Sequence, residues 1–387
     1  MTLAAALTTG DAAQLPSRRQ EDWRWSDLRG LVRTMPPKSP RLAAPVDPGG
    51  PFACIPAIEV VIANGHLNWW PEENRGGVEV TIHQKPDLPR KAERLPMASL
   101  AAANAGDPPI TIIQFNSGET QPILLRFVSN ATLTSHHARV GVMVKAGASA
   151  LLLESYEGAG EGYFANHLLE IFVEEGGALE RVVIVGEVAD AISVSTADVN
   201  LRPGAQFAQT VLTSGAKRQR HETHVANPGG GSQVRLDGVY LLEAGHADLT
   251  TEVIHQGLDG ATRQLTKGAV RGASRAVFQG RIVVREGADR TDARMGHHAL
   301  ILSERAEVDA KPELEIYADD VACAHGNTVG ALDEEALFYA RSRGILEPEA
   351  RAMLTEAFVG EVVDRIEHDG ARDVARTWVA AHLRGES

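Results

Sequence analysis

Cysteine and histidine lie two residues apart in the segment 319–326, which reads Asp-Asp-Val-Ala-Cys-Ala-His-Gly. Residues two apart on an extended strand point to the same side, so Cys323 and His325 are expected to share one face. A thiolate and an imidazole are ligands that iron or an iron–sulfur cluster accepts. Two ligands do not complete a metal site, so a packed thiol beside a hydrogen-bonded histidine is the alternative interpretation.

Other reactive side chains have simpler explanations. Cys54 has no histidine close by in the sequence and is predicted to pack as a small apolar residue. Neighbouring strand residues point to opposite faces, so each of the histidine pairs at 136–137 and 297–298 is a poor chelate, and we expect solvated or hydrogen-bonded surface histidines there. The glycine run at 228–232 lacks the Gly-Lys-Ser/Thr ending of a phosphate-binding loop. The carboxylates at 319–320 could serve acid–base chemistry in a carbohydrate-active β-helix, but acidic residues at a strand end are common.

Composition narrows the class of protein that must position these residues. The 387 residues carry 38 Lys and Arg against 51 Asp and Glu, a net charge of −13, which disfavours nucleic acid and anionic membranes as partners. Two cysteines are too few for a secreted disulfide framework. The chain has no signal-peptide pattern and no apolar run of about 18 residues, so we expect a cytoplasmic protein.

Glycines mark a repeat through the middle of the chain. Turn signals recur at Gly147, Gly177, Gly204, Gly231, Gly260 and Gly287, spaced by 30, 27, 27, 29 and 27 residues. A β-prone run follows each signal, and a fixed period of this length indicates stacked units, because one coil cannot bury its own apolar face. The pattern predicts a β-solenoid, in the form of a parallel β-helix, with a large antiparallel sandwich as the alternative.

The repeat divides the chain into four regions. Residues 1–34 are predicted to be helical, and residues 35–56 form a proline-rich linker, because proline is excluded from helix interiors and central strands. The β-helix core is expected over residues 57–332. Residues 333–387 are predicted to be helical, with Asp333 as the first N-cap.

Apolar residues recur at helical spacing in this last region. The stripe either caps the end of the solenoid or fills the groove of a partner. The candidate partner-binding residues are Leu337, Phe338, Met353, Leu354, Phe358 and Val362.

The segments 303–321, 323–330, 332–339 and 341–345 together are similar to the SufB/SufD family of iron–sulfur cluster assembly scaffolds. Weaker matches lie at residues 16–23, 274–281 and 291–293. Within the family the chain resembles the SufD form more than the SufB form, because it is short, is poor in cysteine and carries the Cys-x-His-Gly-x-Thr-Val-Gly pattern.

The resemblance implies a right-handed parallel β-helix between helical N- and C-terminal regions. It further implies a non-catalytic scaffold that pairs with SufB, and a SufB–SufD heterodimer that is bound to two copies of the ATPase SufC through the C-terminal helices. A transient iron–sulfur cluster would form at the SufB–SufD interface, with His325 as this chain's ligand and Cys323 as a second candidate. The isolated chain would hold no cluster and could form a homodimer. The alternative is a structural SufB partner whose Cys–His pair is inert.

Overall fold

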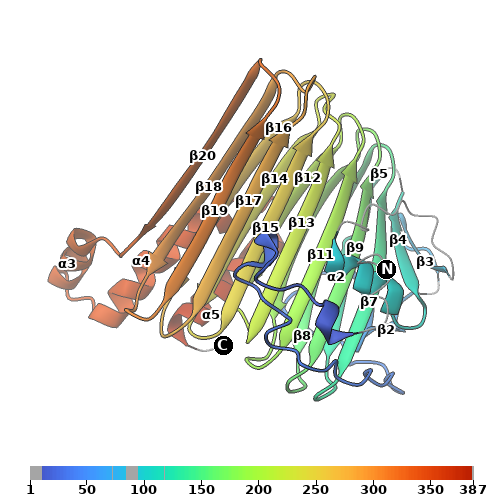
Figure 1. The fold of residues 1–387 in the computed structure, drawn as a ribbon, viewed down its shortest axis with the longest axis horizontal. Coiled ribbons are helices and arrows are strands. Elements are labelled where there is room, and N and C mark those ends of the chain that lie inside the picture. Colours follow the sequence, from blue (N-terminus) through green and yellow to red (C-terminus); the bar gives the residue numbers. More distant parts are fainter. Residues whose placement is uncertain (1–10, 72, 84–94, 117, 386–387) are drawn as a thin grey trace.

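The computed structural model describes residues 11–71, 73–83, 95–116 and 118–385. It is mainly β, with two sheets that face one another and form a β-solenoid of about eight turns (Figure 1). The chain passes from one sheet to the other at each half-turn, so strands that are neighbours in a sheet belong to successive coils. The parallel β-helix predicted from the glycine period is therefore confirmed, and the antiparallel sandwich is wrong.

We name each sheet by its last strand. The β20 sheet has the order β2 (His66–Trp69), β1 (Ile58–Ala63), β6 (Ile123–Ser129), β8 (Ala148–Gly158), β10 (Ala178–Gly186), β12 (Gln206–Thr213), β14 (Gln233–Leu242), β16 (Ala261–Val270), β18 (Thr291–Ile301) and β20 (Val321–Gly330), with β5 (Gly118–Glu119) beside β8. The β19 sheet has the order β19 (Glu307–Ile316), β17 (Arg275–Val284), β15 (His246–His255), β13 (Arg218–Asn227), β11 (Ile192–Leu201), β9 (Phe164–Val173), β7 (Ser135–Val144), β4 (Ile110–Phe115) and β3 (Val78–His83). Among the strands of the described residues, the β1–β2 and β3–β4 pairs are antiparallel and the other pairs are parallel.

Tight turns between the sheets use the predicted glycines. Gly147, Gly204 and Gly287 have φ values of 68°, 69° and 79°, a left-handed conformation that a side chain would disfavour. At the expected turn near residue 260, Asp259 takes the positive φ instead. These turns keep successive coils in register, so inward residues of one coil pack on those of the next and form the apolar core.

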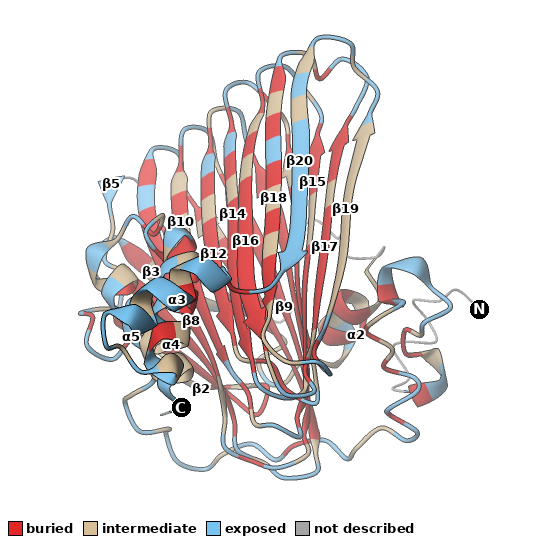
Figure 2. Ribbon diagram, turned by 90° about the vertical axis from the view of Figure 1, so that its left-hand side faces the viewer, coloured by how far each residue is buried: buried red, intermediate tan, exposed pale blue. Residues whose placement is uncertain are grey.

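The three C-terminal helices are α3 (Glu334–Ser342), α4 (Glu347–Val363) and α5 (Asp369–Arg384). Asp333 caps α3 as predicted, because its side chain accepts hydrogen bonds from two backbone N–H groups of the first turn. Helices α4 and α5 share an apolar cluster with outward residues of the β20 sheet, whereas α3 lies beyond the sheet (Figures 1 and 2). The helices therefore cover one outer face of the solenoid.

The N-terminal region is less helical than the sequence suggests. Residues 11–34 contain two short 3-10 helices, η1 (Ala12–Gln14) and η2 (Glu21–Trp23), and residues 1–10 lie outside the described part. The residues form an arm on the outer face of the β19 sheet, where the helix α2 (Pro96–Asn104) also packs. The linker 35–56 is an extended strap whose Phe52 is fully buried.

Arginines of β13 hold the N-terminal arm. The guanidinium of Arg220 donates to the carbonyl of Asp22 over 2.8 Å and lies 4.2 Å from the centroid of the Trp23 ring. Arg218 donates to the carbonyl of Trp25 over 3.0 Å. These contacts join segments about 200 residues apart, so the position of the arm depends on β13 in the middle of the solenoid.

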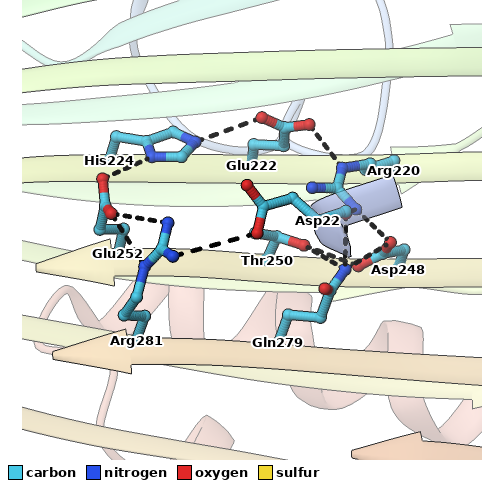
Figure 3. A network of polar contacts seen from close by, with 9 residues as sticks. All are labelled: Asp22, Arg220, Glu222, His224, Asp248, Thr250, Glu252, Gln279 and Arg281. Atoms are coloured by element: carbon cyan, nitrogen blue, oxygen red, sulfur yellow. Dashed lines mark hydrogen bonds and ion pairs between the residues drawn. The ribbon is translucent and has the colours of Figure 1, made fainter. Parts of the chain in front are cut away.

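A network of charged groups surrounds this contact (Figure 3). The imidazole of His224 lies between two carboxylates, with its Nε2 3.2 Å from Glu222 and its Nδ1 3.3 Å from Glu252. Arg220 pairs with Glu222, and Arg281 pairs with Glu252. Burial by itself lowers the pKa of His224, but hydrogen bonds to the two glutamates outweigh it and raise the pKa to about 9.

The raised pKa of His224 predicts a pH-dependent stability. Its contribution should be complete below pH 6.5, where the unfolded histidine is also protonated, and should vanish as the pH rises through about 9. We expect the free energy of unfolding of the native protein to be larger than that of His224→Gln by on the order of 3 kcal/mol near pH 6. This difference should shrink toward pH 9. Thermal unfolding of both proteins across this range measures it. A difference that does not change with pH would mean that the pKa of His224 is the same in the folded and unfolded chain, and a difference that falls below pH 6.5 would mean that His224 is neutral in the fold.

Candidate functional site

The strand β20 carries both residues of the predicted ligand pair. Its register places Cys323 beside Ala293 and His325 beside Met295. Ala293 and Met295 are buried in the apolar cluster at the end of the solenoid, and alternation along the strand puts Cys323 and His325 on this same inward side. The expectation that the two side chains share a face is therefore met by the geometry of β20.

The two side chains differ in exposure. Cys323 is half-buried against the apolar cluster, whereas His325 is exposed. The reason is that β20 is the last strand of its sheet, so no further coil covers it (Figure 2). Among the described residues no side chain or backbone group is hydrogen-bonded to the His325 ring, which leaves its nitrogens available to a ligand.

Burial raises the pKa of the Cys323 thiol, and the carboxylate of Asp292 adds to the effect, although a hydrogen bond with the Ala293 backbone opposes it. The thiol of the free chain is thus poorly suited to act as a thiolate at neutral pH. A nearby cation, such as a metal ion, would favour the thiolate and reverse this tendency. In this chain alone, His325 is the better prepared ligand.

Polar residues next to the pair extend the site along the inner face. His297 of β18 is fully buried. Its Nε2 forms a hydrogen bond of 2.9 Å with the Tyr240 hydroxyl, and its Nδ1 lies 2.7 Å from the side-chain oxygen of Asn327. Burial lowers the pKa of His297 to about 4, so it is neutral at physiological pH. His297 therefore orients Asn327, two residues from His325, and this contact could not be read from spacing within one strand.

Several predictions about isolated residues are corrected here. The histidines at 136–137 and His297 are buried rather than at the surface, because both faces of these strands are covered. Cys54 is exposed instead of packed, because the strap turns its neighbour Phe52 inward. Only His298, which contacts Thr328 at 2.7 Å, behaves as expected for a surface histidine.

The described residues contain no group of three or more His, Cys, Asp or Glu side chains that could hold a metal ion. The network around His224 and the fully buried Arg181–Glu154 pair are satisfied within the fold. A cavity of about 710 Å³ lies between the strap and α5, and neither Cys323 nor His325 lines it. The pair on β20 is thus an incomplete site at an open surface.

The candidate partner-binding residues fall into three groups. Leu337 and Val362 are buried, and Leu354 and Phe358 are half-buried, with Phe358 and Val362 packed toward the β20 sheet. Phe338 is 74% exposed and Met353 is 50% exposed. Since Tyr339 and Leu346 are exposed as well, α3 and the start of α4 carry an apolar surface with no cover from the described chain.

No helix in the described part of the chain is long and apolar enough to cross a membrane.

Comparisons with known proteins place the chain in one family. Residues 127–358 match the family described as "SUF system FeS cluster assembly, SufBD core domain". The chain is 28% identical to the iron–sulfur cluster assembly protein SufD of Escherichia coli, over 99% of this chain and 92% of that protein. It is 26% identical to a SufBD family protein of Synechocystis, over 91% of this chain and 84% of that protein. It is also 31% identical to the chloroplastic protein ABCI7 of Arabidopsis thaliana, over 72% of this chain and 61% of that protein.

The matched region covers most of the solenoid, β20 with its Cys–His pair, α3 and the larger part of α4. The Escherichia coli and Synechocystis relatives are named as iron–sulfur cluster assembly proteins, and the resemblance read from residues 303–345 is confirmed. The chain therefore belongs to the SufBD family of the SUF system, which assembles iron–sulfur clusters.

Proposed function

We propose that this chain is a non-catalytic scaffold subunit that pairs with SufB and the ATPase SufC, and that a nascent iron–sulfur cluster forms where its open end meets SufB. The observation that carries the proposal is the exposed His325 on the uncovered last strand, with Cys323 two residues away on the same side. The cluster is the product that the complex assembles and hands on, not a resident cofactor of this chain.

An incomplete ligand set at an open edge favours a shared site. An iron–sulfur cluster needs about four ligands, and β20 offers at most two. The remaining ligands would come from the partner that covers this end. Such coverage would also remove water from around Cys323 and His325, and bound iron would stabilise the thiolate that burial alone disfavours.

The exposed surface of α3 and the start of α4 suits the contact with SufC. Phe338 and Met353 are large, apolar and exposed, which fits helix-mediated docking. Val362, in contrast, packs inside against the β20 sheet and supports the fold. We therefore assign the outer residues of the stripe to SufC and the inner ones to internal packing.

The connection between the two surfaces suggests how ATP could drive assembly. Strand β20 ends at Gly330 and α3 begins at Glu334, so a displacement of α3 acts directly on the strand that bears His325. Helix α4 stays bound to the sheet through the buried Val362 and the Lys267–Glu361 pair. Movement of SufC would thus open or reshape the edge at β20 without unfolding the solenoid.

The ligand role predicts the effect of His325→Ala. The substitution removes an exposed ring that makes no hydrogen bond with the described residues, so folding and complex formation should be unchanged. The cluster content of the complex with SufB and SufC should fall by about tenfold. Removal of a group that merely supports a ligand already lowers metal affinity by about tenfold or more, and removal of the ligand itself should lower it at least as much. Anaerobic purification followed by iron and sulfide analysis measures the content.

The matched control is His298→Ala, which removes a histidine from the neighbouring strand on the opposite face. It should leave cluster content unchanged. If His325→Ala retains full cluster content, this chain is a structural partner of SufB and the Cys–His pair is inert.

The SufC contact predicts the effect of a charge on the exposed helix surface. Phe338→Glu and Met353→Glu should each weaken SufC binding by about tenfold, because a buried unpaired carboxylate costs more than one hydrogen bond. Thr377→Glu, on the exposed side of α5, should bind normally. Calorimetric titration with purified SufC measures the affinities. Equal binding by all three variants would place the contact elsewhere.

A further inference from the structure

Basic side chains gather where the N-terminal arm continues into the strap. Residues 18–41 carry seven Lys and Arg against three Asp and Glu, a net charge of +4 in a chain whose total is −13. All seven cations are exposed, at positions 18, 19, 24, 29, 33, 38 and 41. The basic excess is therefore a local feature, opposite in sign to the charge of the whole chain.

The carboxylates of this stretch already have partners within the fold. Glu21 pairs with Lys311 of β19 over 2.8 Å. Asp22 points toward Arg281 of β17, 4.0 Å away (Figure 3). Asp27 accepts a hydrogen bond of 2.9 Å from a backbone N–H of its own turn. The negative groups of the arm are thus directed to the solenoid or to the local backbone, and not to the neighbouring arginines.

The cations, in contrast, are almost all without a carboxylate partner. Arg41 pairs with Asp107 over 3.3 Å, and the other six form no ion pair with any residue in the described ranges. Arginines inside the solenoid behave differently, since Arg181 and Arg220 are buried and paired with carboxylates. The arm therefore presents guanidinium groups that the chain itself does not use.

The backbone of the arm brings four of these arginines close together. The N–H of Arg29 donates to the carbonyl of Pro16 over 3.1 Å, so the chain folds back on itself. Arg18 and Arg19 follow shortly after Pro16 and lie beside the turn that carries Arg29 and Arg33. Four positive charges from two parts of the arm thus share one small surface.

Buried contacts hold this surface in place. Trp23, Leu28 and Val32 are buried in one apolar cluster under the arm. The hydroxyl of Ser26 donates to the carboxylate of Asp248 on β15. Groups that are already positioned lose less conformational entropy when they bind. The arginines are therefore carried by an anchored segment and are prepared for a ligand of opposite charge.

We propose that the arm is a docking surface for an acidic segment of a partner protein, whose carboxylates are bound by Arg18, Arg19, Arg29 and Arg33. The fork of a guanidinium group matches a carboxylate through two parallel hydrogen bonds. The arm lies on the outer face of the β19 sheet, whereas α4 and α5 cover the outer face of the β20 sheet (Figure 2). This partner is therefore additional to those of the proposed function, and its docking does not depend on them.

A protein segment fits this surface better than a nucleic acid or an anionic membrane. Strand β19 meets the arm at Lys311, and the same side of the strand carries an acidic row, Glu307, Asp309, Glu313 and Glu315. A duplex or a lipid surface would extend beyond the arm and meet this row and the rest of the acidic chain. A short acidic segment can contact the arginines alone.

Fluorescence anisotropy of a labelled peptide of alternating Glu and Ala, titrated with the full chain, tests the docking surface. We expect binding that weakens as salt is added, and none with Gln in place of Glu in the peptide. The fourfold variant Arg18→Gln, Arg19→Gln, Arg29→Gln and Arg33→Gln should bind about tenfold more weakly, since each exposed ion pair contributes a factor of about two. Thermal unfolding checks that the variant folds, and the double variant Arg18→Gln and Arg19→Gln replaces it if it does not.

The matched control removes four exposed cations from turns of the solenoid and changes the net charge equally: Arg202→Gln, Lys217→Gln, Arg285→Gln and Arg305→Gln. Its affinity should stay within about twofold of the native value. Equal weakening by both sets would mean that net charge alone attracts the peptide, and would overturn the docking surface. Failure of the native chain to bind the acidic peptide would overturn it as well.

Two further titrations test the class of partner. Tighter binding of the arm to vesicles of anionic phospholipid or to duplex RNA than to the acidic peptide would overturn the assignment to a protein segment. The peptide should bind equally well when SufB and SufC are present. Loss of peptide binding in their presence would assign the arm to contacts within that complex and overturn the additional partner.

Discussion

A coil of this chain cannot bury its own apolar face, and the whole structure follows from that constraint. Each strand obtains its backbone partners and its packing from the coil before and the coil after, which fixes the parallel register through both sheets. The last coil has no successor, so β19 and β20 remain half-partnered and β20 is largely exposed. The candidate ligands lie on that coil. The stacking that stabilises the middle of the molecule thus creates the open end at which the chain can work with a partner.

The repeat and its consequences could be predicted from the sequence, because turn chemistry and alternation are local. Glycines at 27- to 30-residue spacing indicated the coils, and Asp333 indicated the first C-terminal helix. The N-terminal arm could not be predicted in this way. Its conformation depends on Arg218 and Arg220, about 200 residues away, which donate hydrogen bonds to its backbone carbonyls. In a long helix these carbonyls would instead accept hydrogen bonds from N–H groups of the helix itself.

The site was only partly predictable for a similar reason. Alternation along a strand gives the shared face of Cys323 and His325, but not their exposure, which depends on β20 being last in its sheet. The contact between His297 and Asn327 joins two coils and has no signal within either strand. Helical periodicity likewise grouped Met353 with Val362, although Met353 is half exposed and Val362 packs against the sheet, because periodicity does not reveal what a stripe contacts.

The central claim is that His325 is this chain's ligand to a cluster shared with SufB. Pulsed electron paramagnetic resonance tests it most directly, on a reduced complex in which only this chain carries ¹⁵N-labelled histidine. The account predicts a ¹⁵N hyperfine coupling of the size expected for a directly bound imidazole, and its disappearance in the His325→Ala complex. A cluster that forms in the native complex without any ¹⁵N coupling would contradict the claim and place all of its ligands on other subunits or on other residue types.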